Sequence, residues 1–515
     1  MRQLRFVFFP AIVAGCVATA SAQDLTEAYG LSNLTVQGTA RSMGFGNALG
    51  SVGGDFSSLS VNPAGLGVYR SSEFTFTPSL RINSTSSEYT NQTTADNNTH
   101  FNVNNFGMVF TRAPHGRHYD HRNWKAVSFA FGMNRTADFN NNYTYQGKNT
   151  TSSGSQVFES DANLDKADAG NAYGSTLGAM GYQSYLLNRN ANGTYSSIVP
   201  FQGGVNQLKT VQQNGGVNEY LLSLGGNYKE KLMLGMTIGI PSINIQRNST
   251  YSETLADGNT QANPGGFNSF TYNENTNITG AGINAKIGAI YKVNDLFRIG
   301  AAFHSPTYYS ISDMSTPSLS SNADSSGSYF YHNRFDYNLT TPWKGVLSAT
   351  VLLDKIGFIT ADYEYVDYSS MRYEYPGGMD NNGNSLQLAQ DAMNQQIKKT
   401  FQPASNFRLG AEGRLSKYFM IRAGFGYYGN AYTSYGESTA TSFYSTERID
   451  LSCGLGFRFN HFFTDLGYVH SMYQGYEQPY TIDYSGVNTG YAATVPTAKI
   501  NYNVNNLALT VGMKF

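Results

Sequence analysis

Charged residues, cysteine, tryptophan and long apolar segments are all scarce in this 515-residue chain. Asp, Glu, Lys and Arg make up 13% of the sequence, about half of the roughly 25% usual in soluble domains. The mean hydropathy of −0.36 excludes a helical membrane protein. The net charge of −1 gives no basic surface for nucleic acid.

Aromatic residues and glycine, in contrast, are abundant. The chain has 38 Tyr, 32 Phe and 54 Gly but only two Trp. Low charge and many aromatic residues, without a long apolar segment after the N-terminus, are typical of an outer-membrane barrel. The strands of such a barrel alternate between lipid-facing and lumen-facing residues.

Residues 1–22 are predicted to be a secretory signal peptide. Arg2 and Arg5 precede an apolar segment, and Ala20-Ser21-Ala22 gives a small-residue cleavage site before Gln23. Its removal leaves 32 basic and 35 acidic residues, a net charge of −3, and Cys453 as the single cysteine, so that no intrachain disulfide is possible. The alternative is a lipoprotein signal ending in Gly15-Cys16, with a lipid on Cys16.

Fourteen segments alternate in the way that β-strands do. The apolar positions Ile449, Leu451 and Leu455, for example, alternate with Asp450 and Ser452. The predicted strands lie near residues 72–84, 103–112, 123–136, 217–229, 231–245, 268–291, 296–311, 328–352, 355–374, 402–414, 417–430, 442–460, 461–474 and 498–515. A soluble sandwich would also alternate, so this pattern alone does not decide the fold.

The connections between these segments alternate between short and long. Short turns are expected at 229–231, 292–295, 353–355, 415–417 and 460–461, and long polar segments at 85–102, 137–216, 246–267, 312–327, 375–401, 431–441 and 475–497. Short periplasmic turns, long outer loops and an even strand number characterise bacterial outer-membrane barrels. We therefore predict an all-β, 14-stranded antiparallel transmembrane barrel over residues 72–515. Residues 385–399 have helical spacing within one outer loop, and residues 164–187 are expected to be partly helical.

Gly38 to Arg70 is too rich in glycine for a regular helix or strand. It contains Asn62-Pro63-Ala64-Gly65, in which Pro fixes φ and Gly allows a positive φ. A compact irregular segment followed by many strands suggests a plug inside the barrel. We therefore expect residues 23–71 to form an N-terminal hatch, although composition alone allows an ordinary loop.

Other candidate sites are weak. The glycines around Phe45 lack the strand–turn–helix context of a phosphate loop. The turn with His115, His118, His121 and Asp120 has interleaved arginines and is read as a solvated turn instead of a metal site. Asp380, Asn382, Asn384 and Asp391 only partly match a calcium loop. The pairs His304-Ser305 and His470-Ser471 point to opposite faces of a strand. The sequence therefore predicts no enzyme, no cofactor and no metal.

The charged residues on the lumen face are more informative. Arg408, Arg422 and Arg458 should point inward if the apolar face meets lipid, and a guanidinium binds a carboxylate bidentately. We list them as candidates for a ligand carboxylate. The alternative is that they pair with other lumen charges, which are expected at Arg298, Glu412, Asp450 and Asp465.

The chain resembles the FadL family of outer-membrane channels for long-chain fatty acids and other hydrophobic compounds. The residues that carry the resemblance are Gly38-Thr39-Ala40-Arg41, Gly44, Gly46, Asp55-Phe56-Ser57-Ser58, Asn62-Pro63-Ala64-Gly65, Thr341-Pro342-Trp343, Asp362-Tyr363, Tyr365-Val366-Asp367-Tyr368, Asn406 to Glu412 and Asp465-Leu466-Gly467-Tyr468. The plug is most similar to that of Bacteroidetes-type members. The terminal Phe515 is similar to the signal read by the outer-membrane assembly machinery.

The resemblance implies an outer-membrane channel, and because a closed barrel has no strand edges that demand partners, we expect a monomer. A hydrophobic ligand would bind in an apolar pocket, the hatch would shift, and the ligand would leave sideways into the membrane, which an apolar solute favours over water. The hatch or gating residues would be Gly38, Arg41, Gly44, Gly46, Asp55, Asn62, Pro63 and Ala64. The alternative is a PorV-like barrel of type IX secretion, which has the same fold but binds and shuttles secreted proteins.

Overall fold

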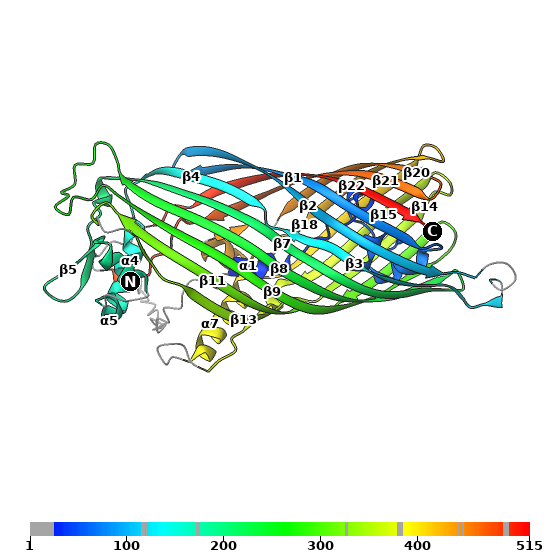
Figure 1. Ribbon diagram of the computed structural model, residues 1–515, viewed down its shortest axis with the longest axis horizontal. Coiled ribbons are helices and arrows are strands. Elements are labelled where there is room, and N and C mark those ends of the chain that lie inside the picture. The colour runs from blue at the N-terminus through cyan, green and yellow to red at the C-terminus, as the bar shows by residue number, and fades with distance from the viewer. Residues whose placement is uncertain are drawn as a thin grey trace, which may run out of the picture.

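The computed structural model describes residues 25–114, 119, 121–170, 176–324, 328–378, 385–439, 442–444, 447–487 and 494–515. Most of the chain forms one antiparallel sheet that closes on itself, because β1 (Glu73–Tyr89) pairs both with β2 (Gln92–Arg112) and with β22 (Ala498–Lys514) (Figure 1). Among the described helices, none is long and apolar enough to cross a membrane.

The barrel has fourteen strand positions, as predicted. In order these are β1, β2, β3 with β4 (Trp124–Asp138, Asn141–Asn149), β7 (Val205–Tyr228), β8 (Leu232–Leu255), β9 (Ser269–Lys292), β10 with β11 (Phe297–His304, Tyr308–Ser321), β14 with β13 (Lys344–Leu352, Asn333–Thr340), β15 with β16 (Gly357–Asp367, Arg372–Glu374), β17 (Pro403–Arg414), β18 (Phe419–Tyr428), β20 (Arg448–Phe459), β21 (Phe462–Glu477) and β22. The short strands β12 (Tyr329–Phe330) and β19 (Ser442–Tyr444) extend the sheet, whereas β5 (Leu187–Arg189) and β6 (Tyr195–Ser197) form a separate hairpin.

The predicted alternation of faces is confirmed. In β20, Leu451, Leu455 and Phe457 lie outside, whereas in β18 Arg422 is buried inside. The same outward apolar pattern runs through β7, β8, β10, β14 and β22. The exposed side chains make an apolar belt around the barrel of the kind that faces lipid.

The turns at one end of the barrel are short, as expected. β7 and β8 are joined by residues 229–231, and β20 and β21 by residues 460–461. Some predicted loops were wrong. Strand β4 and the first part of β7 lie within the expected loop 137–216, and β8 extends to Leu255, into the expected loop 246–267. Residues 85–102 are not a long loop either, because β1 and β2 continue to a two-residue turn at Thr90 and Asn91, both with positive φ. The polar Asn- and Thr-rich sequence resembled a loop, but these strand ends lie far beyond the apolar belt, where an outward face need not be apolar.

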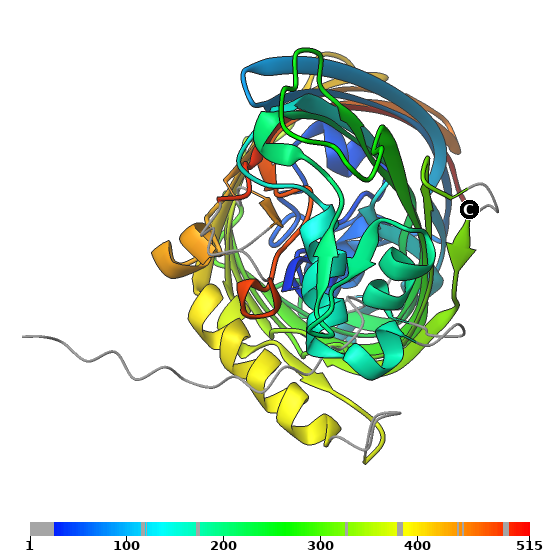
Figure 2. The same ribbon diagram turned by 90° about the vertical axis from the view of Figure 1, so that its left-hand side faces the viewer.

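The opposite end carries the long connections, and helices lie across the mouth of the barrel in the end-on view (Figure 2). Between β4 and β7 are α4 (Ser155–Leu164), α5 (Lys166–Ala169), α6 (Leu177–Gln183) and η3 (Phe201–Gly203). The helix predicted at 385–399 is confirmed as α7 (Leu386–Thr400), which lies against the side of the barrel. The remaining helices of this end are η4 (Tyr368–Ser370), α8 (Ser434–Thr439) and η5 (Tyr484–Gly486).

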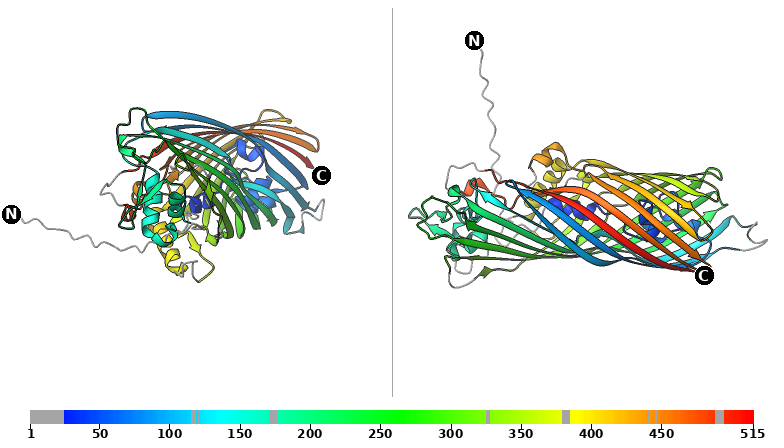
Figure 3. Two further views of the ribbon diagram at one scale, coloured as in Figure 1. Left: turned by 60° about the vertical axis from the view of Figure 1, so that its left-hand side comes forward. Right: turned by 90° about the horizontal axis from the view of Figure 1, so that it is seen from above.

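Residues 25–71 run inside the barrel, and we call this segment the hatch (Figure 3). It contains α1 (Leu25–Ser32), α2 (Ala40–Gly44), η1 (Phe56–Ser60) and η2 (Pro63–Val68). Its apolar side chains, among them Phe45, Leu49, Phe56, Leu59 and Leu66, are completely buried.

Several predictions fall on residues outside the described ranges. These are the signal peptide 1–22 with Cys16, His115, His118 and Asp120 of the histidine turn, and Asp380, Asn382 and Asn384 of the calcium-like loop. Within the described ranges, no three His, Cys, Asp or Glu side chains gather closely enough to hold a metal ion.

Candidate functional site: the hatch and the cavities beside it

The hatch lies directly on the backbone of the barrel wall. Gly225 of β7 is opposite Gly235 of β8, and Gly235 is opposite Gly288 of β9. A Cβ at Gly235 would lie 2.2 Å from the carbonyl oxygen of Pro63, and one at Gly225 would lie 2.9 Å from Leu66 Cβ. Glycine in a strand allows this close approach of another segment.

Similar glycines continue around the barrel. An added Cβ would come within 2.5 Å of hatch backbone at Gly300, Gly410, Gly424 and Gly467. Together with Gly225, Gly235 and Gly288 we call these the contact glycines. At these positions the wall carries no side chain because the hatch lies directly against it.

The turn at Asn62 is the point where the hatch is bonded to two strands. Asn62 Oδ1 accepts a hydrogen bond from Ala64 N at 3.1 Å and begins η2, with Pro63 at its first position. Its Nδ2 donates to the carbonyl oxygen of Gly50 at 2.6 Å and reaches those of Ala289 in β9 at 3.2 Å and Ala301 in β10 at 3.4 Å. Asn62 is fully buried, so its amide is committed to these carbonyls.

Arg41 and Asp55 are brought together beside the barrel wall. Asp55 caps η1 by accepting from Ser57 N at 2.9 Å, and it also accepts from Thr39 Oγ1. Arg41 Nε lies 3.0 Å from Glu412 of β17, and its Nη1 lies 3.8 Å from Asp55. Burial opposes the charge of Arg41, but Glu412 and Asp55 more than compensate and raise the pKa of the guanidinium above its usual range.

The remaining predicted hatch residues also lie in close contacts. A Cβ at Gly38 would lie 2.0 Å from Ser57 Oγ, and one at Gly44 would lie 3.1 Å from the Cα of Gly454 in β20. Gly46 has φ +71°, a left-handed conformation that favours glycine. The eight residues therefore hold the hatch together and against the wall, and a gating role for them stays a prediction.

The three arginines proposed to bind a ligand carboxylate are each paired with protein carboxylates. Arg408 lies 3.2 Å from Glu364, and Arg422 lies 2.6 Å from Glu412. Arg458 and Arg422 both reach Asp465, at 2.9 and 2.8 Å. These contacts favour the alternative stated above, that the lumen charges neutralise one another, and carboxylate binding by these arginines stays a prediction.

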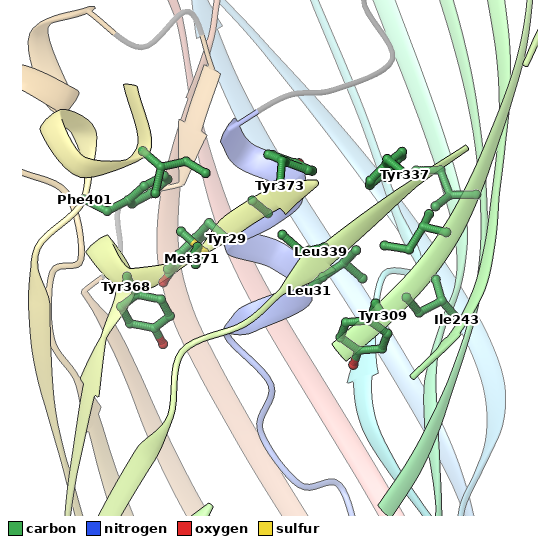
Figure 4. Packing of buried hydrophobic residues seen from close by; sticks show 14 of the residues in the cluster. Tyr29, Leu31, Ile243, Tyr309, Tyr337, Leu339, Tyr368, Met371, Tyr373 and Phe401 are labelled. Atoms are coloured by element: carbon green, nitrogen blue, oxygen red, sulfur yellow. The ribbon is translucent and has the colours of Figure 1, made fainter. Parts of the chain in front are cut away.

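The first part of the hatch packs in a different way, through aromatic rings. Tyr29 of α1 stacks on Phe401 with ring centroids 5.8 Å apart and meets the edge of Tyr368 at 5.1 Å. Figure 4 shows Tyr29 between Phe401, Tyr368 and Met371 on one side of the lumen, with Leu31 turned toward Leu339 and Tyr309. Side-chain packing, without contact glycines, holds α1 in place.

After α1, the hatch pairs briefly with the inside of β3. Thr35 N donates to Thr136 O at 2.9 Å, and Gln37 N donates to Arg135 O at 2.8 Å. The ladder between β3 and β7 has a register shift between Arg135 and Ala137. This bulge frees the two carbonyls to turn toward the hatch.

Two cavities lie on either side of this hatch segment. The larger has a volume of about 190 Å³ and lies between residues 29–37 of the hatch and β1, β3, β20, β21 and β22. Its apolar lining comes from Tyr29, Val36, Met43, Phe139, Val469, Tyr473 and Val504. Its polar lining includes Arg448, which pairs with Asp450 at 3.1 Å and lies over the ring of Tyr428 at 3.8 Å.

The smaller cavity, of about 70 Å³, has several charged residues in its lining. Lys286 pairs with Glu219, and His304 Nε2 lies 2.8 Å from Val61 O. Lys344 Nζ donates to Leu34 O of the hatch at 3.3 Å. Sequence reasoning missed Lys344, Lys286 and Arg448, although Arg448 continues the inward register of Asp450.

A seam in the barrel wall runs beside the larger cavity. The ladder between β2 and β3 ends at the pair Asn105 and Asn134. Beyond it, β4 pairs in a ladder with β7, and β2 with β1. The contact between β2 and β4 consists of side-chain bonds such as Asn98 Nδ2 to Asn142 Oδ1 at 3.0 Å and Thr94 Oγ1 to Thr144 O at 2.6 Å.

Comparisons with known proteins support the fold. No family model and no curated protein sequence matches this chain. Among solved structures, it is similar to a Pseudomonas aeruginosa FadL homologue with a TM-score of 0.53 and 11% identity, over 94% of this chain and 98% of that one. It is also similar to the Pseudomonas putida toluene transporter TodX, with a TM-score of 0.50 and 12% identity over 94% and 100% of the two chains. At these identities the likeness confirms the resemblance to FadL proteins at the level of the fold.

Proposed function

We propose that this chain is an outer-membrane channel that takes up small hydrophobic compounds through a lumen closed by its hatch. Three observations support the proposal. The fold is shared with a FadL homologue and a toluene transporter. The barrel has an outward apolar belt, and a cavity of about 190 Å³ lies between the hatch and the wall. The cavity carries the most weight, because it gives a solute a place to bind next to a seam.

The size of the cavity favours a compact ligand. A cavity of about 150 Å³ holds benzene in a well-known engineered protein, whereas sites for larger molecules measure roughly 300–1,000 Å³. A cavity of about 190 Å³ therefore accommodates a single aromatic ring better than a long acyl chain. A long-chain fatty acid would need α1 to move first.

Only the first part of the hatch is suited to movement. Residues 38–71 rest on the contact glycines and are bonded through Arg41 and Asn62. Residues 25–37 rest on no contact glycine and are held by ring packing, two backbone bonds to β3, and side-chain bonds to the wall at Glu27, Asn33, Leu34 and Thr35. We expect residues 25–37 to shift and to join the two cavities that they now separate.

The seam between β2 and β4 is the proposed exit. Separating these strands breaks side-chain bonds such as Asn98 to Asn142 but no backbone ladder. The seam begins at Asn105 and Asn134, close to Phe101, which is exposed at the end of the apolar belt, so that an apolar solute leaving at this end of the seam enters lipid and avoids the cost of crossing water.

Uptake by vesicles that contain the purified protein tests this proposal. Val504 lines the cavity, whereas Val511 lies on the same strand but faces outward. Val504→Phe should fill the cavity and abolish uptake of a labelled single-ring hydrocarbon, whereas Val511→Phe should leave it unchanged. Uptake that is equal in both variants would contradict the assigned cavity. Absence of uptake by the unaltered protein, across single-ring compounds and long-chain fatty acids, would overturn the transport proposal.

The protein-binding alternative has one observation in its favour. Residues 150–170 and 176–204 form a folded cap, in which Phe158, Met180 and Tyr195 are buried together with residues at the strand ends such as Tyr251 and Phe270. Such a cap offers a firm surface for a protein partner. If no solute is taken up, retention of a secreted protein by the intact barrel, and its loss when the cap is deleted, would favour this function.

A further inference from the structure

A groove with a volume of about 930 Å³ crosses the outside of the barrel wall over β3, β7, β8, β9, β10, β14 and β15. Its floor consists of small residues whose register turns them outward, among them Gly226, Ala289, Ala301 and Gly345. Elsewhere on these strands the outward residues are large, as with Leu224 and Ile287. A row of small residues between large ones makes a convex wall locally concave.

Aromatic rings border the groove, and they include both tryptophans of the chain. Trp124 meets the edge of Tyr228 with ring centroids 5.5 Å apart, at the end with the short turns. Farther along, Trp343 packs between Phe303 at 5.9 Å and Tyr365 at 5.6 Å. Amphipathic rings of this kind are enriched where a membrane protein meets the lipid headgroups.

Two lysines stand at the end of the groove next to Trp124. Lys229 N is bonded to the carbonyl oxygen of Asn123 at 2.7 Å, and Lys231 follows two residues later in the same turn. Both side chains are exposed. Nearby, Glu230 pairs with Arg70 and Asp295 with Lys292, so that among the described residues Lys229 and Lys231 have no carboxylate partner within 4 Å.

We propose that this groove binds an anionic glycerophospholipid, with an acyl chain on the small-residue floor and the phosphate at Lys229 and Lys231. An apolar channel that leads to two unmatched ammonium groups suits an amphiphile with a negative head better than a neutral solute. The short-turn end faces the periplasm in barrels of this type, so the lipid would belong to the inner leaflet. This inference rests on the membrane location in the proposed function but not on transport.

The groove also lies directly behind the hatch. Gly225, Gly235 and Gly288 face inward at the same level and contact Pro63 and Leu66 or Asn62. The wall here is only one backbone thick, so a bound acyl chain would support from outside the strands that the hatch presses on from inside. Lipid binding should therefore also stabilise the hatch.

Native mass spectrometry of the purified full-length protein, titrated with phosphatidylglycerol, tests the proposal. We expect one lipid to be retained more tightly than phosphatidylcholine with the same chains, and excess inorganic phosphate should not displace it. Ala301→Phe fills the groove and should abolish preferential retention. Ala423→Phe is the matched control, because Ala423 also faces outward but lies on β18, away from the groove.

The lysines give a second test that leaves the wall intact. Lys229→Gln with Lys231→Gln should weaken phosphatidylglycerol binding roughly tenfold or more, since each lysine near an anionic surface contributes about 1 kcal/mol. Lys355→Gln with Lys417→Gln is the control; Lys417 lies over Tyr418 much as Lys229 lies over Tyr228. Three results would each overturn the proposal. Ala301→Phe could retain the lipid as well as the unaltered protein does, the two lipids could bind equally well, or a dimer could be found that Ala301→Phe dissociates. Lipid retention is measured without a transported solute and uptake without added phosphatidylglycerol, so failure of one proposal is distinguishable from failure of the other.

Discussion

Asn62 of the hatch lies against the backbone of Gly288 in the barrel wall, so closely that a Cβ on Gly288 would lie 1.9 Å from Asn62 Oδ1. The same amide donates to the carbonyl oxygen of Ala289, the next residue of β9. Gly288 therefore leaves the space that the Asn62 side chain occupies, and the Asn62 amide forms the hydrogen bond to β9.

Gly288→Ala should displace the Asn62 turn while leaving the barrel folded. The added methyl group would overlap the side-chain amide of Asn62, which its hydrogen bonds to Gly50 and Ala64 hold in place, so the turn must move away from β9. We expect faster hydrogen exchange in residues 55–68, with little change in the strands. Gly413→Ala, where the nearest atom to the new Cβ is 3.6 Å away, is the control and should leave the exchange of the hatch unchanged. Unaltered protection of the hatch in Gly288→Ala would contradict the close contact.

The sequence was sufficient for the barrel but not for these contacts. The alternation in β20 and β22 and the short turns are patterns of residues that are neighbours in the chain, so they can be read from the sequence directly. The contact glycines depend on pairs such as Gly235 with Pro63, far apart in the chain, and a glycine in a strand carries no local sign of what approaches it. The turn at Thr90 and Asn91 was missed for another reason: outside the membrane both faces of a strand are polar, so strand and loop compositions converge.

Glu412 should be more important for stability than Arg41, although the two form one ion pair. Glu412 accepts from both Arg41 and Arg422, so that Glu412→Gln removes a carboxylate from two guanidinium groups at once and leaves them only Asp55 and Asp465, whereas Arg41→Met leaves Glu412 still paired with Arg422. Removal of one partner from a buried pair costs about 3–5 kcal/mol, and we expect Glu412→Gln near the upper end. Urea unfolding in lipid vesicles measures the difference.

The exposed pair of Arg70 and Glu230 is the control for that comparison. Its side chains are each 40% exposed, and exposed pairs contribute roughly 0–1 kcal/mol. Glu230→Gln should therefore change the free energy of unfolding by less than about 1 kcal/mol. A larger effect at Glu230 than at Glu412 would show that the lumen charges do not hold the hatch.

Cross-linking the seam should block uptake. In a Cys453→Ser background, cysteines at Asn98 and Asn142 joined by a disulfide or a short bis-thiol reagent would tie β2 to β4 across the proposed exit. Uptake should be lost on cross-linking and, for the disulfide, restored by reductant. Cysteines at Ser84 and Asn97, which face each other within the β1–β2 ladder, are the control and should leave uptake unchanged. Uptake that continues through a closed seam would place the exit elsewhere.

Helix α7 completes the wall at β16, whose second edge would otherwise be open. β16 pairs with β13 on one side, and on the other its backbone is bonded by side chains of the helix. Asn394 accepts from Tyr373 N at 2.8 Å and donates to Tyr373 O at 2.9 Å, and Gln390 accepts from Tyr375 N at 2.9 Å. Residues four apart on a helix lie on one face, so this helix can satisfy alternate amides of a strand.

Asn394→Ala should therefore uncouple α7 from β16. It leaves a donor and an acceptor of Tyr373 without these partners, and an unsatisfied buried group costs about 1–3 kcal/mol. Hydrogen exchange at Tyr373 and Tyr375 should accelerate, and the aromatic packing of Tyr29 against Phe401 beside it should loosen in turn. Gln387→Ala is the control, since Gln387 is exposed and donates to Asp391 of its own helix. Unchanged exchange at Tyr373 in Asn394→Ala would show that α7 lies on the barrel without protecting the edge of β16.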